Sequence, residues 1–160
     1  MSAFGGIADI DRIFRNSGSA AADNGATTVS DNGLITIASA YSVKDTIDRV
    51  ETDIKLKGLT VFARVDHAAG AMEVGLSLAP TLLLIFGNAR GGTPLMQAKQ
   101  QVGIDLPLKM LAWQDGSGAT WLTYNDPHWI AERHGLGQEV DQTVKVLSGV
   151  MAAVAKQATT

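Results

Sequence analysis

The segment Thr81–Phe86, with the sequence TLLLIF, constrains the fold more than any other part of the chain. It is too short to cross a membrane, which takes about 18 or more apolar residues, and it has no clearly polar side. Strands that are apolar on both sides belong in the interior of a sheet whose two faces are covered. We therefore expect Thr81–Phe86 to form a central strand, for which the rest of the chain supplies neighbouring strands and covering helices.

The segments around this strand alternate between the two-residue period of strands and the 3.6-residue period of helices. Further strands are expected at 34–41, 59–67, 109–114 and 120–124, and helices at 43–57, 68–73, 94–103, 127–134 and 140–154. A chain of 160 residues suits one domain. The sequence predicts a single α/β domain of the α+β kind, with two layers and helices packed on a mixed sheet.

The first helix of this pattern has local signals at both ends. Ser42 followed by Asp45 resembles a capping box, and Gly58 suits a left-handed end. Side chains four residues apart share a helix face, which predicts the ion pairs Asp45–Arg49 and Glu51–Lys55. Farther along, Thr93 and Pro94 are expected to begin the helix after the central strand.

Residues 1–33 are expected to form a flexible N-terminal arm and linker, and residues 34–160 the domain. The stretch 16–33 is rich in Ser, Ala, Gly, Asn and Thr, a composition that cannot build a core. Before it, Ile7, Ile10 and Phe14 have the spacing of a short amphipathic helix. That segment is either a frayed arm or cloning remnant, or a helix that docks on a partner.

Charge and composition exclude several classes of function. The formal net charge is −3, with 13 basic and 16 acidic residues, and this argues against nucleic-acid binding because such proteins need a basic surface for phosphates. The absence of cysteine excludes disulfides and thiolate metal sites. No apolar run is long enough for a membrane span and no secretory signal is recognisable, so a cytoplasmic location is expected, or a periplasmic one if a signal has been removed.

Five short strings, taken together, identify a resemblance to a known family. They are Gly58–His67, Pro80–Thr81 leading to Leu84–Asn88, Gly92–Met96, Ile104–Lys109 and Tyr124–Pro127. From about Tyr41 to Gly135 the chain resembles the domain of unknown function 302 family. The resemblance implies a small two-layer α/β domain that tends to form homodimers, and it implies haem binding as a possible function because some members look like haem-binding proteins.

His67, at the end of an expected strand, is the first candidate for a functional residue. A neutral imidazole can be an axial haem ligand, a metal ligand or a general base, and the other interpretation is a histidine that hydrogen-bonds the backbone. With Met72 and Met96 as soft neighbours, His67 supports our first hypothesis: a homodimeric, non-enzymatic domain that binds haem or another flat apolar ligand. The second hypothesis is a structural or protein-interaction module.

A metal-dependent hydrolase is the third hypothesis. His128 and Glu132 are four residues apart and share a helix face, but a metal site needs a further ligand such as His67 or Asp66. The alternative is a solvated pair near a helix start. His134 falls in the last turn of the same helix, where a structural role at the negative helix end is favoured. No catalytic residue is assigned from the sequence.

The glycine-rich stretch 87–92 runs from the central strand into a helix and is a candidate anion site. Free amides at a helix start, together with a guanidinium, can hold a phosphate or carboxylate. The candidate residues are Asn88, Arg90, Gly91, Gly92 and Thr93. The alternative is a structural turn, because the spacing fits neither nucleotide-binding fingerprint.

Four aromatic residues lie close together in sequence around the expected hairpin: Trp113, Trp121, Tyr124 and Trp129. They predict either core and dimer packing or the wall of a pocket for a flat ligand.

Overall fold

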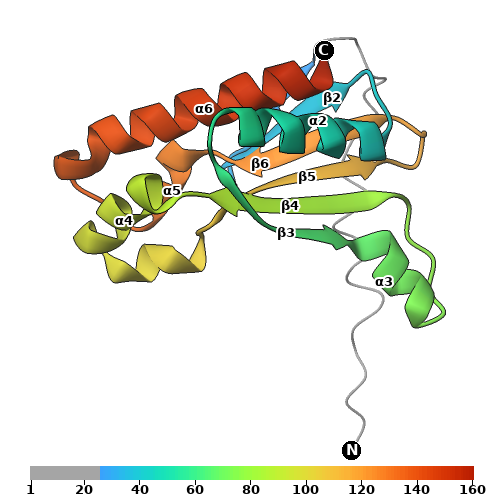
Figure 1. Ribbon diagram of the computed structural model, residues 1–160, viewed down its shortest axis with the longest axis horizontal. Helices are drawn as coiled ribbons and strands as arrows, with labels where there is room; N and C mark the ends of the chain where they lie inside the picture. Colours follow the sequence, from blue (N-terminus) through green and yellow to red (C-terminus); the bar gives the residue numbers. More distant parts are fainter. Residues whose placement is uncertain (1–25) are drawn as a thin grey trace, which may run out of the picture.

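The strands of this protein form one open sheet of six strands, as the computed structural model shows for residues 26–160, the part of the chain that is described (Figure 1). The order across the sheet is β1-β2-β6-β5-β4-β3, and every neighbouring pair is antiparallel. The strands are β1 (Thr27–Val29), β2 (Leu34–Ser39), β3 (Thr60–Asp66), β4 (Thr81–Gly87), β5 (Leu108–Gln114) and β6 (Thr120–Asn125).

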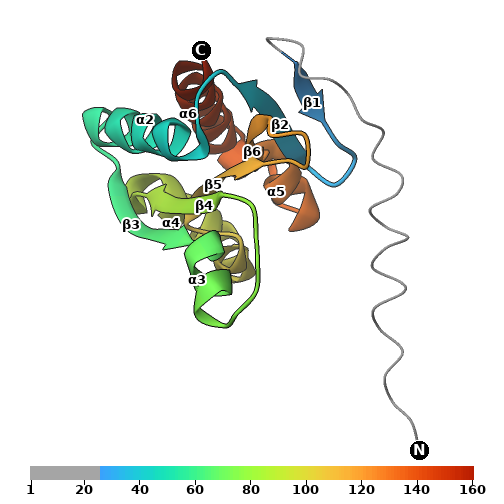
Figure 2. The same ribbon diagram turned by 90° about the vertical axis from the view of Figure 1, so that its right-hand side faces the viewer.

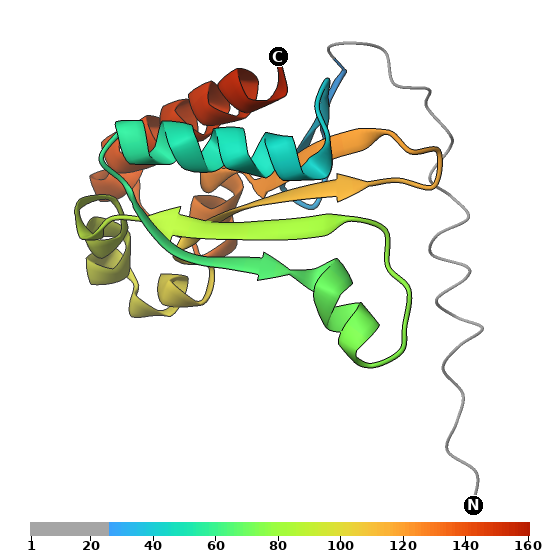
Figure 3. The same cartoon turned by 45° about the vertical axis from the view of Figure 1, so that its right-hand side comes forward.

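Helices α2 (Val43–Leu56) and α6 (Asp141–Thr159) lie side by side on one face of the sheet (Figures 1 and 2). The shorter helices α4 (Ala89–Ala98) and α5 (Pro127–Arg133) gather at one end of the sheet, and α3 (His67–Glu73) lies beyond the opposite end of β3 (Figure 3). Two 3-10 turns, η1 (Gln100–Ile104) and η2 (Gln138–Val140), complete the chain. Within residues 26–160, no helix combines the length and the apolar character needed to cross a membrane.

The prediction of a single α+β domain with helices packed on a sheet is confirmed, but the sheet is antiparallel throughout and not mixed. The reason lies in the crossover through α2. It connects β2 to β3, which run in the same direction, and such strands would be parallel if they were neighbours. Here β6, β5 and β4 lie between them, so each strand meets only antiparallel partners.

The apolar segment at 81–86 does form an interior strand, β4, between β5 and β3. Its two sides differ, contrary to expectation: Leu82, Leu84 and Phe86 are buried, whereas Leu83 and Ile85 are half-buried. The buried side faces the helices, and no described helix covers the other side. The main core comprises this buried side and the apolar stripes of α2 and α6, including Ile47, Val50, Ile54, Met110, Leu122, Met151 and Val154.

Helix α2 begins and ends as its sequence predicts. The Ser42 hydroxyl accepts a hydrogen bond from the Asp45 amide at 3.1 Å, and Gly58 has a φ of 72°. The Glu51–Lys55 pair forms, with 2.7 Å between Oε1 and Nζ. Arg49, however, is not paired with Asp45: it donates to the carbonyl oxygens of Gln157 and Ala158 at the end of α6. Those carbonyls lack helical partners, so the guanidinium is a better match for them than for a solvated carboxylate.

The ordered domain begins earlier than the sequence indicates. Residues 27–29, which composition places in the linker, form β1 and pair with β2 from Thr27 opposite Ile37 to Val29 opposite Ile35. The expected helix at Ile7–Phe14 lies outside the described residues.

The expected hairpin is present as β5 and β6, and two of its tryptophans pack on each other. Trp113 and Trp121 are stacked with ring centroids 6.3 Å apart on the side of the sheet opposite α2 and α6. In the turn, Asp115 accepts hydrogen bonds from the Ser117 hydroxyl and the Trp121 indole, which lower the pKa of Asp115 to about 2. Tyr124 is buried in the core, whereas Trp113, Trp121 and Trp129 are half-buried.

Candidate functional site

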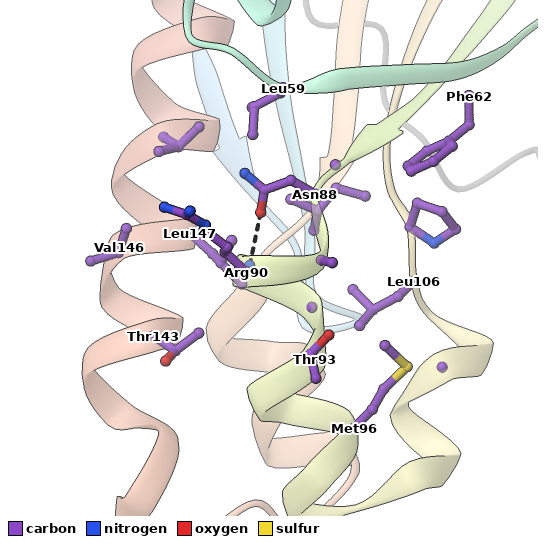
Figure 4. Close-up of a pocket in the computed structure, with 18 of the residues that line it drawn as sticks. Leu59, Phe62, Asn88, Arg90, Thr93, Met96, Leu106, Thr143, Val146 and Leu147 are labelled. Carbon is purple, nitrogen blue, oxygen red and sulfur yellow. Dashed lines mark hydrogen bonds between the residues drawn. The ribbon is translucent and has the colours of Figure 1, made fainter.

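A cavity of about 640 Å³ lies at the end of the sheet where β4 gives way to α4 (Figure 4). Its walls come from β3, α4, α6 and the segment between η1 and β5. Most of them are apolar, including Leu59, Phe62, Met96, Leu106, Leu147 and Val150. The polar lining consists mainly of Asn88, Arg90, Thr93, Gln142 and Thr143.

The start of α4 sets the shape of this cavity. Asn88 is the N-cap: its side-chain oxygen accepts from the Gly91 amide at 2.8 Å, and its carbonyl accepts from the Gly92 amide at 3.2 Å. The expectation that Thr93 and Pro94 begin the helix is therefore wrong, since both lie inside α4. As an N-cap, asparagine stabilises a helix at least as well as threonine. Glycine is found within a helix where another element packs closely against the helix backbone.

That close approach is between α4 and α6. A Cβ atom on Gly91 would lie 3.0 Å from the Leu147 Cδ2 atom, which is closer than an ordinary contact, so a larger residue would require the Leu147 side chain to shift. On the other side of α4, a Cβ on Gly103 would lie 3.3 Å from the Met96 sulfur. Two glycines therefore leave room for the Leu147 and Met96 side chains, which form opposite walls of the cavity.

The candidate anion residues all line this one cavity, but the structure changes how they would act. The amides of Gly91 and Gly92 are already hydrogen-bonded within the cap and first turn, so they are not free donors. The groups that remain are the Arg90 guanidinium and the Thr93 hydroxyl, both on exposed residues at the cavity. Figure 4 shows Arg90 between α4 and α6, beside Val146 and Leu147. Among residues 26–160, no carboxylate forms an ion pair with Arg90.

His67 lies away from the cavity. It is the exposed first residue of α3, at the carboxyl end of β3, whereas Leu59 and Phe62 line the cavity at the other end of that strand. A strand of seven residues spans about 23 Å. Met96 lines the cavity, but Met72 does not: it is exposed and borders a second hollow of about 700 Å³, together with Asp66.

This arrangement bears on haem, which the family resemblance implies. Haem in a protein takes axial ligands such as histidine, methionine, cysteine or tyrosine. The cavity lining contains Met96 and no histidine, and His67 cannot reach the same ligand within one chain. The residues present therefore do not fit haem held between His67 and Met96, and we assign no role in iron binding to either.

The alternative metal ligands are not brought together either. His128 and Glu132 are both exposed on α5, whose N-cap is Asp126, and neither lines the cavity. Within the described residues, no three side chains among His, Asp and Glu gather closely enough to hold a metal ion.

A polar cluster beside the cavity was not predicted from the sequence. Nε2 of His134 lies 2.5 Å from Oδ2 of Asp105, and Arg133 contacts the same carboxylate at 3.2 Å. Lys109 donates to the Pro107 carbonyl at 2.9 Å, and burial lowers the pKa of this lysine. This cluster joins α5 to the segment before β5, which carries the cavity residue Leu106.

Most of the apolar wall was also missed from sequence. Val146 and Val150 are four residues apart on α6 and both line the cavity; Val146 is exposed, and Val150 lies at the edge of the main core. A second apolar side on an otherwise amphipathic helix is the one signal that could have pointed to them. Leu59, Phe62 and Leu106 carry no such signal, since each lies in or beside a strand or loop.

The fold of this protein matches that of a solved structure. It is similar to the crystal structure of the uncharacterized conserved protein DUF302 from Bacillus stearothermophilus, with a TM-score of 0.70 and 20% identity, over 79% of this chain and 98% of that one. In sequence, it is 51% identical over 131 residues to proteins named Fluoride-specific ion channel FluC 1 from Brucella suis biovar 1 (strain 1330) and Brucella abortus biovar 1 (strain 9-941).

Each of these curated matches covers 82% of this chain, but the chain spans only about half the length of the relatives, 52% and 48% respectively. The family model described as Domain of unknown function DUF302 matches residues 35–154, which is most of the chain. The protein therefore belongs to the DUF302 family.

Proposed function

We propose that this domain binds a small, largely apolar molecule that carries an anionic group, in the cavity between α4, α6 and the start of β3. The observation that carries the proposal is the cavity itself. Its volume of about 640 Å³ lies within the roughly 300–1,000 Å³ of small-molecule sites. Mostly apolar walls with a few polar groups at one place are typical of such sites.

The apolar walls supply affinity, and Arg90 supplies orientation. Each Å² of apolar ligand surface removed from water contributes about 25 cal/mol. The guanidinium of Arg90 can form two parallel hydrogen bonds to a carboxylate or sulfonate, and the Thr93 side chain, which carries a hydroxyl, also lines the cavity. A flat molecule with acidic groups matches the apolar walls and the guanidinium of this cavity.

Binding of 8-anilinonaphthalene-1-sulfonate, a flat apolar anion whose fluorescence rises in apolar sites, tests the proposal. We expect saturable binding to the folded protein, and about tenfold weaker binding to Arg90→Gln, because a hydrogen bond to a charged group contributes about 1.5 kcal/mol or more. The matched control is Lys145→Gln on the exposed side of α6, which should bind like wild type. Equal loss in both variants, or no binding to wild type, would contradict the proposal.

The relatives favour a second candidate function, that of a module that acts together with a fluoride channel. The supporting observation is the 51% identity to about half of two proteins that are named as such channels. Fluoride release from liposomes that contain the full-length Brucella suis relative should change at least severalfold when its matched half is deleted. An unchanged release rate, with equal amounts of both forms in the liposomes, would count against this role.

A further inference from the structure

The aromatic residues of this protein lie mostly away from the ligand cavity, and this favours one class of ligand. Among residues 26–160, Phe62 is the only aromatic residue in the lining. The three tryptophans and both tyrosines lie elsewhere, and the rest of the apolar lining consists of methionine and aliphatic side chains. A site for a flat ring system gains from aromatic side chains that stack on the ligand. The walls present here suit an aliphatic ligand better.

The cavity bends around the first turn of α4. Figure 4 shows Arg90 and Leu147 on the side of α4 that faces α6, and Phe62, Leu106 and Met96 on the side that faces η1. All five residues line the same cavity. A hollow that has walls on two sides of one helix is elongated, so it fits a long flexible molecule better than a compact rigid one.

Two glycines keep the path between these two sides open. As noted above, a Cβ atom on Gly91 would crowd Leu147. A Cβ atom on Gly92 would lie on the other side, 3.6 Å from the Cδ1 atom of Leu106 and 3.7 Å from the Cε atom of Met96. Because neither position carries a side chain, a ligand can pass over the backbone of α4 from one side to the other.

Three polar residues lie together at the α6 side of this path. Gln142 and Thr143 belong to the first turn of α6, and Arg90 lies between α4 and α6 (Figure 4). Within the described part of the chain, Arg90 is the only cationic side chain in the lining, and it forms no ion pair. A single cation at one side of an apolar path matches a ligand with one negative charge at one end.

We propose that the ligand is a fatty acid, a linear aliphatic carboxylate whose head group binds Arg90 and whose chain crosses Gly91 and Gly92 toward Met96. This inference rests on the proposed function and names its class of ligand. Arg90 holds the carboxylate through two parallel hydrogen bonds. Met96 is half-buried, and its unbranched side chain can adapt to the methyl end of the ligand.

Chain length should therefore control affinity. Each CH₂ group that is fully buried strengthens binding about fourfold. Calorimetric titration of the full chain with octanoate, decanoate and dodecanoate, each below the concentration at which it forms micelles, measures this dependence. We expect at least about fourfold tighter binding for each two added CH₂ groups, which corresponds to half burial. Decylammonium, which has the chain of decanoate and the opposite charge, should bind about tenfold more weakly than decanoate or worse.

A substitution at Gly92 tests where the chain lies. Gly92→Leu places a side chain between Leu106 and Met96, where the methyl end of a long ligand would bind. It should weaken dodecanoate at least tenfold and octanoate less than twofold, because the shorter chain does not reach that end. Gly92→Ala adds one methyl group at ordinary contact distance, so it should fold even if the leucine variant does not, and it should weaken dodecanoate about threefold.

The matched control is Gly70→Leu in α3, outside the cavity, where no atom lies within 4 Å of the added Cβ. It should bind all three acids like wild type. Circular dichroism of each variant confirms that it is folded.

Three results would overturn the fatty-acid proposal: affinity that does not change with chain length, equal binding of decylammonium and decanoate, or equal weakening of octanoate and dodecanoate by the Gly92 variants. The fluorescent anion 8-anilinonaphthalene-1-sulfonate separates this proposal from the broader one. If that anion binds and no fatty acid does, the class of ligand is wrong and the proposed function stands. If neither binds, both are wrong.

Discussion

Replacing Gly33 with alanine should lower the free energy of unfolding by about 3 kcal/mol or more, one of the two largest effects that the structure predicts. Gly33 has a φ of 80°, a conformation that costs an L-residue about 1–2 kcal/mol. Its added Cβ would also lie 2.1 Å from the Cγ atom of Trp129, far inside contact distance. Trp129 would have to move, and with it α5, whose N-cap Asp126 donates its amide to the Gly33 carbonyl.

Gly118→Ala separates the two causes. Gly118 also has a left-handed φ, 87°, but no atom lies within 4 Å of the position that an added Cβ would take, so only the backbone cost of about 1–2 kcal/mol remains. Urea unfolding followed by tryptophan fluorescence gives both values. If both variants lose the same free energy of unfolding, the close approach of position 33 to Trp129 does not affect stability. That result would contradict the packing of α5 on the β1–β2 turn.

Replacing Phe86 with alanine should cost about 3–5 kcal/mol, which is comparable to the whole stability of many domains of this size. Phe86 is fully buried near the end of β4, where it lies opposite Val61 of β3 and Leu108 of β5, and it belongs to the main core that α2, α6 and the sheet build together. A cavity in such a place cannot collapse easily, because strands and helices on all sides hold its walls apart.

Leu83→Ala is the comparison, since Leu83 lies on the same strand but on the side that no described helix covers. Leu83→Ala should lower the free energy of unfolding by about 1 kcal/mol, because Leu83 buries less apolar area than Phe86. Calorimetric melting of both variants at one pH measures the difference. If both variants lose similar free energies of unfolding, the outer side of β4 must be covered in solution by something other than this chain's helices.

Local signals in this sequence predict local structure well. Ser42 and Gly58 mark the ends of α2 because capping depends on a few neighbouring residues, and the stripe from Val140 to Val154 marks α6. The same reasoning failed at α4, where two caps compete. Thr93 before Pro94 is a good helix start, but the side chain of Asn88 reaches the Gly91 amide one turn earlier, and close packing on α6 favours the longer helix.

Strand order and the cavity could not be predicted, because both depend on contacts between distant segments. The crossover through α2 predicts that β2 and β3 run in one direction, but nothing in either strand indicates that three others lie between them. The cavity likewise combines Phe62 of β3 with Met96 of α4 and Leu147 of α6. His67 attracted interest because histidine is chemically versatile, and that versatility says nothing about which end of a strand faces a cavity.

The three-residue strand β1 protects one edge of the sheet. It lies outside the stretch 35–154 that the family model matches, and it covers the edge of β2. A sheet with two long free edges could add copies at both sides and grow into a polymer. A final strand as short as β1 offers too few backbone groups to recruit another chain. Within the described residues, β3 is therefore the one long edge of the sheet that stays open to another strand.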